Sequence, residues 1–233
     1  MRWTTAILVV GLAAFADEAE DARAKEAIEA FKGGYAAKLE TDRVKAVEPL
    51  GQFPHPSVIR VLAALLTSDG DRVRATAAQA LGKFPGRKDV APLLGAALKP
   101  NEDHPDVVAA ILAALGGTGD PAAAKPLADF LDDNIAKRDK EDLAGEVAAV
   151  GALKQLHTKS ALEALLDSHK KNSVVGGVKG KGQGGERKGK QQLAKELKKA
   201  LRDVTGQQFD GWQEWDDWWD DNAARFDEQL NPK

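Results

Sequence analysis

Apolar residues recur along this chain at the spacing of one face of an α-helix, and one phrase of the pattern is repeated. Over residues 73–82 and again over 107–116, Val, Ala and Leu occupy relative positions 0, 7 and 8, and Gly follows. Positions 0, 7 and 8 share one helix face, and a glycine is typical of a helix end. A recurring unit of this kind cannot bury its apolar face alone, so the units are predicted to stack into a solenoid.

Diverged copies of the phrase extend the pattern in both directions. Leu50 and Leu153 continue the series of Leu81 and Leu115, with successive spacings of 31, 34 and 38 residues. In the last copy, Lys154 stands where the other copies have glycine. The helical periodicity, interrupted by prolines and glycines, predicts antiparallel helix pairs. The predicted pairs are 42–53 with 57–66, 71–84 with 89–98, 105–115 with 121–131, and 141–156 with 159–169.

The best-preserved unit carries a family resemblance. Residues 71–82, Asp-Arg-Val-Arg-Ala-Thr-Ala-Ala-Gln-Ala-Leu-Gly, precede a helix with Ala-Pro-Leu-Leu at 91–94, and together they resemble a short bacterial HEAT repeat. The match is good over residues 71–131 and partial over 42–66 and 141–169. The resemblance implies an all-α, right-handed α-α superhelix of about four helix pairs within residues 42–171, with capping helices at both ends.

The same resemblance implies a function and a surface for it. HEAT-repeat proteins are mostly scaffolds, so we expect a non-catalytic protein that binds an unknown protein partner along a concave groove. The second helices, 57–66, 89–98, 121–131 and 159–169, are expected to line that groove, with Arg60, Lys88, Lys125 and Asp129 as candidate contacts. Short HEAT-like repeats also resemble those of phycobilin lyases, so a HEAT-like lyase or an enzyme accessory protein is an alternative.

The first residues indicate export. A positive start at Met1-Arg2, an apolar run from Ala6 to Phe15 and the small-x-small site at residues 14–16 predict a signal peptide over residues 1–16. The run is too short to span a bilayer permanently, so no transmembrane segment is expected after cleavage. We therefore expect a periplasmic or secreted protein. Residues 17–41 are predicted to form an N-terminal capping helix that stops at Gly33-Gly34.

The residue types restrict the chemistry. The chain contains no cysteine, which removes disulfides and thiolate chemistry, and its net charge of −3 does not favour nucleic acid as a partner of the whole molecule. Four scattered histidines lack the spacing of a metal site, and no catalytic arrangement stands out. We expect no enzyme activity, no cofactor and no bound metal.

Residues 172–190 are rich in glycine and lysine and are predicted to form a flexible loop. Residues 184–190 have the spacing of a phosphate-binding loop, but the strand that should precede such a loop is missing. The lysines could instead contact an anionic polymer without sequence specificity, or simply keep the loop soluble. No specific nucleic acid is expected.

Residues 191–233 combine a basic helix with a tryptophan-rich segment. Trp212, Trp215 and Trp219 fall on one helical stripe, with Trp218 beside it and Phe226 extending it. One interpretation is a C-terminal cap whose tryptophans close the solenoid, and the segment resembles the C-terminal tail of exported bacterial HEAT-repeat proteins. The other is an exposed aromatic platform that binds carbohydrate, such as an envelope polysaccharide, or a partner helix.

Overall fold

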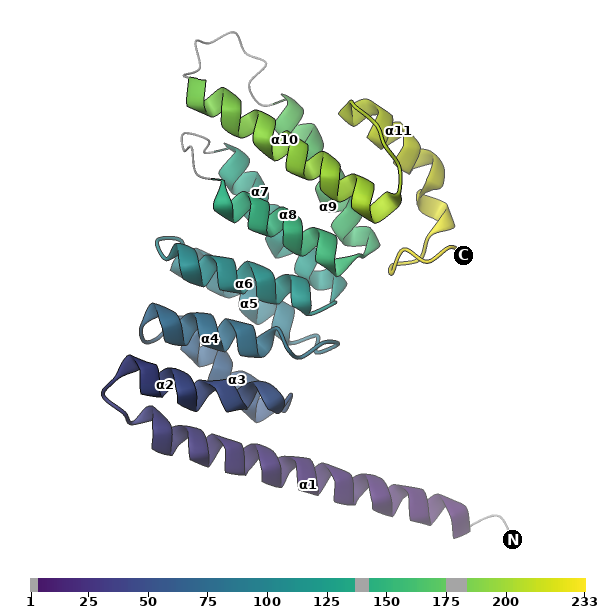
Figure 1. The fold of residues 1–233 in the computed structure, drawn as a ribbon. Helices are drawn as coiled ribbons and strands as arrows, with labels where there is room; N and C mark the ends of the chain where they lie inside the picture. The colour runs from purple at the N-terminus through teal and green to yellow at the C-terminus, as the bar shows by residue number, and fades with distance from the viewer. Residues whose placement is uncertain (1–3, 137–142, 175–183) are drawn as a thin grey trace.

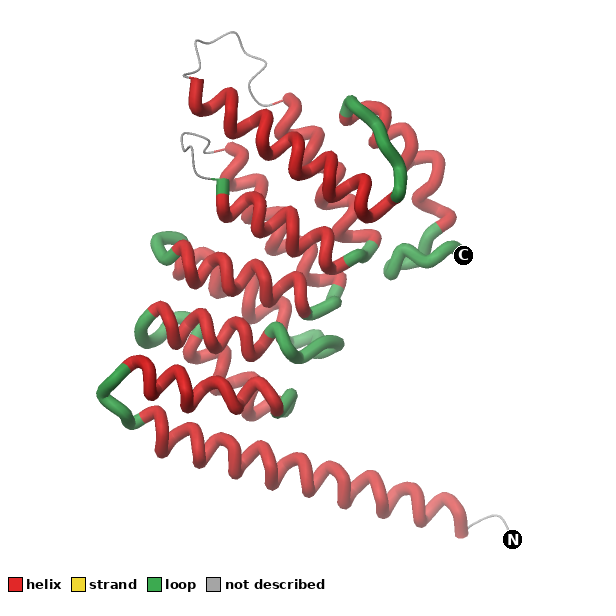
Figure 2. The backbone as a smooth tube through the Cα atoms, in the orientation of Figure 1, coloured by secondary structure: helices red, strands yellow, loops and turns green. Residues whose placement is uncertain are grey.

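The computed structural model describes residues 4–136, 143–174 and 184–233, and these residues form an all-α solenoid (Figures 1 and 2). The α-helices are α1 (Thr4–Tyr35), α2 (Glu40–Val47), α3 (Pro56–Leu65), α4 (Asp71–Leu81), α5 (Val90–Leu98), α6 (Pro105–Gly117), α7 (Ala124–Ala136), α8 (Ala144–Leu156), α9 (Lys159–Val174), α10 (Gly184–Thr205) and α11 (Trp212–Asn222). Short 3₁₀ turns lie at η1 (Glu48–Gln52), η2 (Lys99–Asn101), η3 (Pro121–Ala123) and η4 (Ala223–Arg225). The predicted fold class is confirmed.

The helices form two layers. The first helices of the units, α2 with η1, α4, α6, α8 and α10, stack in one layer, and α3, α5, α7, α9 and α11 stack behind them. α1 packs on α2 at the N-terminal end of the stack (Figure 1). Since α10 continues the first layer and α11 packs on α9 in the second, the basic helix and the tryptophan helix form a fifth pair.

The repeated phrase supplies the core of the first layer. Val73, Leu81, Val107 and Leu115 are completely buried, as the helical spacing predicts. Burying a side chain of this kind stabilises the fold by about 1.5–3 kcal/mol. Each unit therefore contributes a small apolar patch that only its neighbours cover, and the stack is stable as a whole.

The glycine that ends the phrase allows neighbouring first helices to approach one another. A Cβ atom built on each of these glycines would lie 2.8–3.2 Å from atoms of an alanine in the next unit. The three pairs are Gly51 with Ala80, Gly82 with Ala114, and Gly116 with Ala152. The alanine is itself part of the phrase, directly before the leucine. Each copy therefore presents a glycine to the following copy and an alanine to the preceding one.

The ladder ends at the fourth unit. Lys154 occupies the glycine position there, and its Nζ lies 3.2 Å from Asp203 Oδ2 of α10 in an ion pair. α10 buries Leu193, Ala200 and Leu201, which have the relative positions 0, 7 and 8 of the phrase. α10 is thus a fifth copy of the first helix, and an ion pair replaces the glycine contact beneath it.

Two sequence predictions at the ends of helices are wrong. α1 does not stop at Gly33-Gly34 but continues to Tyr35, because Gly34 is the point where α1 crosses α2: a Cβ there would lie 2.9 Å from Ala46 Cβ. The predicted loop at 172–190 is also too long. α9 reaches Val174, α10 begins at Gly184, and Asn172 is buried and donates to Lys190 O at 3.2 Å.

The phosphate-loop spacing at 184–190 falls in the first turns of α10, and the part of the chain that the structure describes places no strand before it. The rest of the predicted loop, residues 175–183, lies outside the described residues. None of the described helices is long and apolar enough to cross a membrane.

The glycine ladder predicts opposite effects for two identical substitutions. Gly116→Ala places a Cβ 2.9 Å from Ala152 Cα, so the backbones of α6 and α8 must separate, and we expect a loss of about 1–3 kcal/mol. Gly151→Ala on α8 has no atom within 4 Å of its new Cβ and should raise stability by about 0.5–1 kcal/mol through helix propensity. Urea unfolding measures the free energy of unfolding of both variants. Equal effects would show that the close approach does not limit the packing.

Candidate functional site

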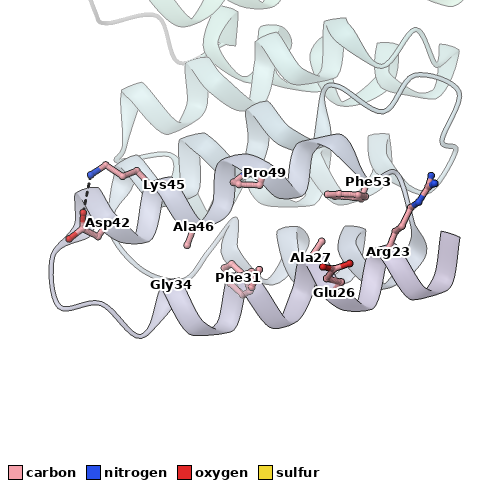
Figure 3. A pocket seen from close by; sticks show the side chains of 11 residues that line it. Arg23, Glu26, Ala27, Phe31, Gly34, Asp42, Lys45, Ala46, Pro49 and Phe53 are labelled. Atoms are coloured by element: carbon pink, nitrogen blue, oxygen red, sulfur yellow. Dashed lines mark hydrogen bonds and ion pairs between the residues drawn. The ribbon is translucent and has the colours of Figure 1, made fainter. Parts of the chain in front are cut away.

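A hollow of about 590 Å³ lies between α1 and the first helix of the first unit (Figure 3). Apolar side chains from both elements line its floor, and charged side chains lie around it. The lining residues are Arg23, Glu26, Ala27, Ala30, Phe31 and Gly34 of α1, and Asp42, Lys45, Ala46, Pro49 and Phe53 of α2, η1 and the residue that follows. The rim carries both signs of charge, with Lys45 and Asp42 paired at 3.1 Å.

The C-terminal end of α1 is clamped to the first unit. Asp69, in the turn after α3, accepts two hydrogen bonds from Arg43 of α2, at 2.7 Å from Nε and 2.6 Å from Nη2. Tyr35 Oη donates to the same carboxylate at 2.6 Å. The hydrogen bonds from the Arg43 guanidinium hold the pKa of Asp69 well below its usual value, and desolvation raises the pKa of Tyr35 to about 12.

This clamp uses a contact that recurs in the next unit. Arg74 of α4 donates to Asn101 Oδ1 at 3.1 Å, and the buried amide of Asn101 donates to the carbonyl oxygens of Leu66 and Ala97. In both units, therefore, an arginine of the first helix binds the turn after the second helix. Only in the first unit does Tyr35 join it, which ties α1 to the stack.

A second contact holds α1 further along. Asp21 Oδ1 lies 2.8 Å from His55 Nε2, and His55 caps the start of α3 through its other ring nitrogen, which accepts from Ser57 N at 3.3 Å. Ala24 is buried beside this contact. Because α1 is fixed at Asp21 and again at Tyr35, the hollow between those two points is a built feature of the structure.

Pro49 explains why a hollow forms here. Proline has no N–H to donate within a helix, and the chain changes at this point from α2 into the 3₁₀ turn η1. Pro49 lines the hollow and also a neighbouring one of about 400 Å³, between η1 and α4, which has a more polar lining. The other lining residues of the second hollow are Glu48, Gln52, Thr76, Gln79, Ala80 and Lys83.

The contact residues predicted from the sequence lie elsewhere. Arg60 on α3, Lys88 before α5, and Lys125 and Asp129 on α7 are all exposed. They belong to the second layer or to its connections, whereas both hollows involve the first layer. Lys125 and Asp129 also pair with each other at 2.9 Å. Sequence reasoning missed the hollow at α1, although a proline inside a copy of the phrase was a visible sign of it.

The structure supports the cap interpretation of the tryptophan segment. Trp215 and Trp219 are buried, and Trp212 and Trp218 are half-buried. Phe209 meets the ring of Trp215 edge-on with centroids 4.9 Å apart, and Lys170 lies 4.7 Å from the ring centroid of Trp212. The alternative of an exposed aromatic platform is therefore wrong for Trp215 and Trp219, whose faces are covered by the protein.

Several polar groups are buried near this cap without hydrogen-bond partners among the described residues. They are Ser168 Oγ, both ring nitrogens of His169, and Trp215 Nε1. Burial, with a smaller contribution from the Lys198 charge, lowers the pKa of His169 to about 4. Ser168 and His169 thus do not hydrogen-bond to each other, and the described residues contain no group of three or more His, Asp or Glu that could hold a metal ion.

Comparison with known families identifies the repeat. A family profile for HEAT repeats matches residues 39–104 and, overlapping them, residues 73–144. These ranges contain Gly51, Gly82 and Gly116 of the glycine ladder and both arginine contacts, whereas Ala152, the partner of Gly116, lies beyond them. No curated protein matches the sequence.

The buried histidine predicts a pH dependence. His169 binds a proton near pH 6.5 in the unfolded chain and only near pH 4 in the folded one. Between these values the unfolded state binds more protons, so stability should fall as the pH drops, by up to about 3 kcal/mol at pH 4. The free energy of unfolding, measured with urea at pH 7 and at pH 4.5, should therefore fall less between these pH values in His169→Leu than in the native protein. If the free energy of unfolding falls equally in both proteins, groups other than His169 cause the pH dependence.

Proposed function

Because the chain belongs to the HEAT-repeat family, we propose that it is a non-catalytic scaffold that binds a protein partner. The partner binds in the hollow between α1 and the first unit, which is called the groove below. One observation carries this proposal: α1 is fixed to the stack at Asp21 and Tyr35, and an apolar hollow of about 590 Å³ lies between these points. An apolar centre within a charged rim is the usual composition of a protein-binding surface.

The shape of the groove favours a helix as the bound element. Its two walls are helical, and its floor presents Ala27, Phe31 and Phe53 to the hollow (Figure 3). An amphipathic helix binds such a groove through apolar residues spaced three or four apart. Charged residues beside that face could pair with Arg23, Glu26, Asp42 or Lys45 at the rim.

The second-helix surface is the less favoured location for the partner. Its candidate residues Arg60, Lys88, Lys125 and Asp129 are exposed, but exposed charges are usually solvated and contribute little to binding. Lys125 and Asp129 would also have to give up their own ion pair. The first layer offers an apolar hollow, and burial of its apolar surface by a partner lowers the free energy of the complex.

Export is also part of the proposal. It is supported by the signal-peptide pattern of residues 1–16 and by the absence of cysteine from the sequence. Cleavage after Ala16 would leave the part of α1 that holds the groove, since Asp21, Ala24, Phe31 and Tyr35 all follow the cleavage site. The scaffold would then act in the periplasm or outside the cell.

A peptide selection tests the groove. Peptides would be selected on the purified protein from a library of amphipathic helices, and their affinity would be measured by fluorescence anisotropy. Ala30→Glu places a charge in the apolar hollow and should weaken binding at least about 10-fold, a loss of roughly 1.4 kcal/mol. The matched control Ala64→Glu lies on an exposed position of α3 and should leave affinity unchanged.

Two results would contradict the proposed location. Peptides that bind Ala30→Glu as tightly as the parent protein would not occupy the groove. Loss of binding in Arg60→Glu or Lys125→Glu, with Ala30→Glu unaffected, would move the partner to the second-helix surface.

Export has a separate test. Expression of the sequence in an exporting bacterium should yield protein outside the cytoplasm whose first residue, read by mass spectrometry, is Asp17. A chain that begins at Asp17 should unfold within about 2 °C of the longer one, because it keeps Asp21 and Tyr35, which bind α1 to the first unit. Uncleaved protein confined to the cytoplasm would refute export.

A further inference from the structure

The outer face of α10 carries a stripe of positive charge. Lys188, Lys195, Lys199 and Arg202 are exposed, and their spacings of 7, 4 and 3 residues place them on one side of the helix. The buried Leu193, Leu197 and Leu201 lie on the opposite side. The stripe is about 21 Å long at the helical rise per residue. None of the four cations forms an ion pair with any residue that the structure describes.

The outer face of α11 carries the opposite charge. Asp217, Asp220 and Asp221 are exposed on the side of the helix away from the buried Trp215 and Trp219. No lysine or arginine occurs in residues 206–224. Within the described residues these three aspartates are in no ion pair, whereas Asp216 binds Lys170 at 2.9 Å.

The two helices that carry these faces both lie at the C-terminal end of the solenoid (Figure 1). Both helices pack on α9, and among the side chains that the structure describes no ion pair joins α10 to α11. A terminal repeat needs a polar outer face to stay soluble, but solubility does not require four cations to share one side of α10 while three acids share one side of α11. The acidic residues Glu196 and Asp203 of α10 lie beside the line of the four cations, and Asp203 pairs with Lys154. Two faces of opposite charge are what a complementary partner would need.

We propose that this end of the solenoid is a dimer interface, in which α10 of each protomer faces α11 of its partner across a two-fold axis. A two-fold arrangement brings the positive face of each copy to the negative face of the other, and the assembly closes at two copies. A second copy is favoured over nucleic acid or another polyanion, because the exposed Asp217, Asp220 and Asp221 at the same end of the solenoid would repel a polyanion. The dimer is held by exposed charges, so it is weak and sensitive to salt.

Charge exchange between the two helices tests the proposal. Variant A carries Lys188→Glu, Lys195→Glu, Lys199→Glu and Arg202→Glu, so its α10 face changes from four positive to four negative charges and both of its faces are negative. Variant B carries Asp217→Lys, Asp220→Lys and Asp221→Lys, so its α11 face changes from three negative to three positive charges and both of its faces are positive. The native protein should dimerise in sedimentation velocity at 20 mM NaCl, with a dissociation constant at least about 10-fold weaker at 500 mM. Each variant alone should be monomeric. An equimolar mixture of A and B should dimerise as tightly as the native protein, since the exchanged charges again face opposite ones.

Circular dichroism checks that both variants are folded. A milder version of variant A carries Lys195→Gln and Lys199→Gln, which remove charge without reversing it. A native protein that stays monomeric at 100 µM in low salt would overturn the proposal. A mixture no tighter than A or B alone would do the same. Growth into open polymers would indicate head-to-tail contact in place of the two-fold dimer. Binding of a DNA duplex by the monomer, lost in variant A, would assign the stripe to a polyanion.

Discussion

The close approach of successive first helices, glycine against alanine, is the constraint on which the structure depends. At Gly51, Gly82 and Gly116 there is no room for a Cβ without displacement of the alanine in the next unit. This spacing lets small apolar patches meet across each interface, and no patch is large enough to be buried by its own unit. Where Lys154 replaces glycine, contact with α10 passes to an ion pair and to leucine packing. The need for a glycine at each close approach thus explains the regular stacking of the first four units. Its replacement by Lys154 explains why the contact between α8 and α10 differs.

The arginine contact between a first helix and the turn after its second helix has a different role in the first unit. Arg74 and Asn101 join elements of the solenoid itself, whereas Arg43 and Asp69 also receive Tyr35 from α1. The first unit therefore holds an additional helix with a contact that the repeat already contains. Opposite α1, the chain changes from α2 into the 3₁₀ turn that contains Pro49, and the hollow lies between α1 and this stretch. Under the proposed function, this hollow is where the protein partner binds.

The two ends of the solenoid differ in their chemistry. The N-terminal end offers an apolar hollow between α1 and α2, and the C-terminal end offers a cationic face on α10 and an acidic face on α11. Apolar burial gives strength to a contact, whereas exposed complementary charge mainly gives orientation and salt dependence. The buried Trp215 and Trp219 fix α11 on α9 and so determine that its aspartates face outwards.

The sequence by itself determined the helix pairs, the repeated phrase and the apolar stripe of the tryptophan segment. These features depend on local periodicity, which records the face of a helix that is buried. Periodicity does not record which element covers that face. Gly34 was expected to end a helix, but the structure uses it where two helices cross, and α10 was expected to be a cap although Leu193, Ala200 and Leu201 repeat the phrase. The groove at α1, the burial of His169 and the two charged faces at one end arise only from the placement of elements distant in the chain. Only the tertiary structure could decide them, because contacts between such elements depend on packing across the whole stack.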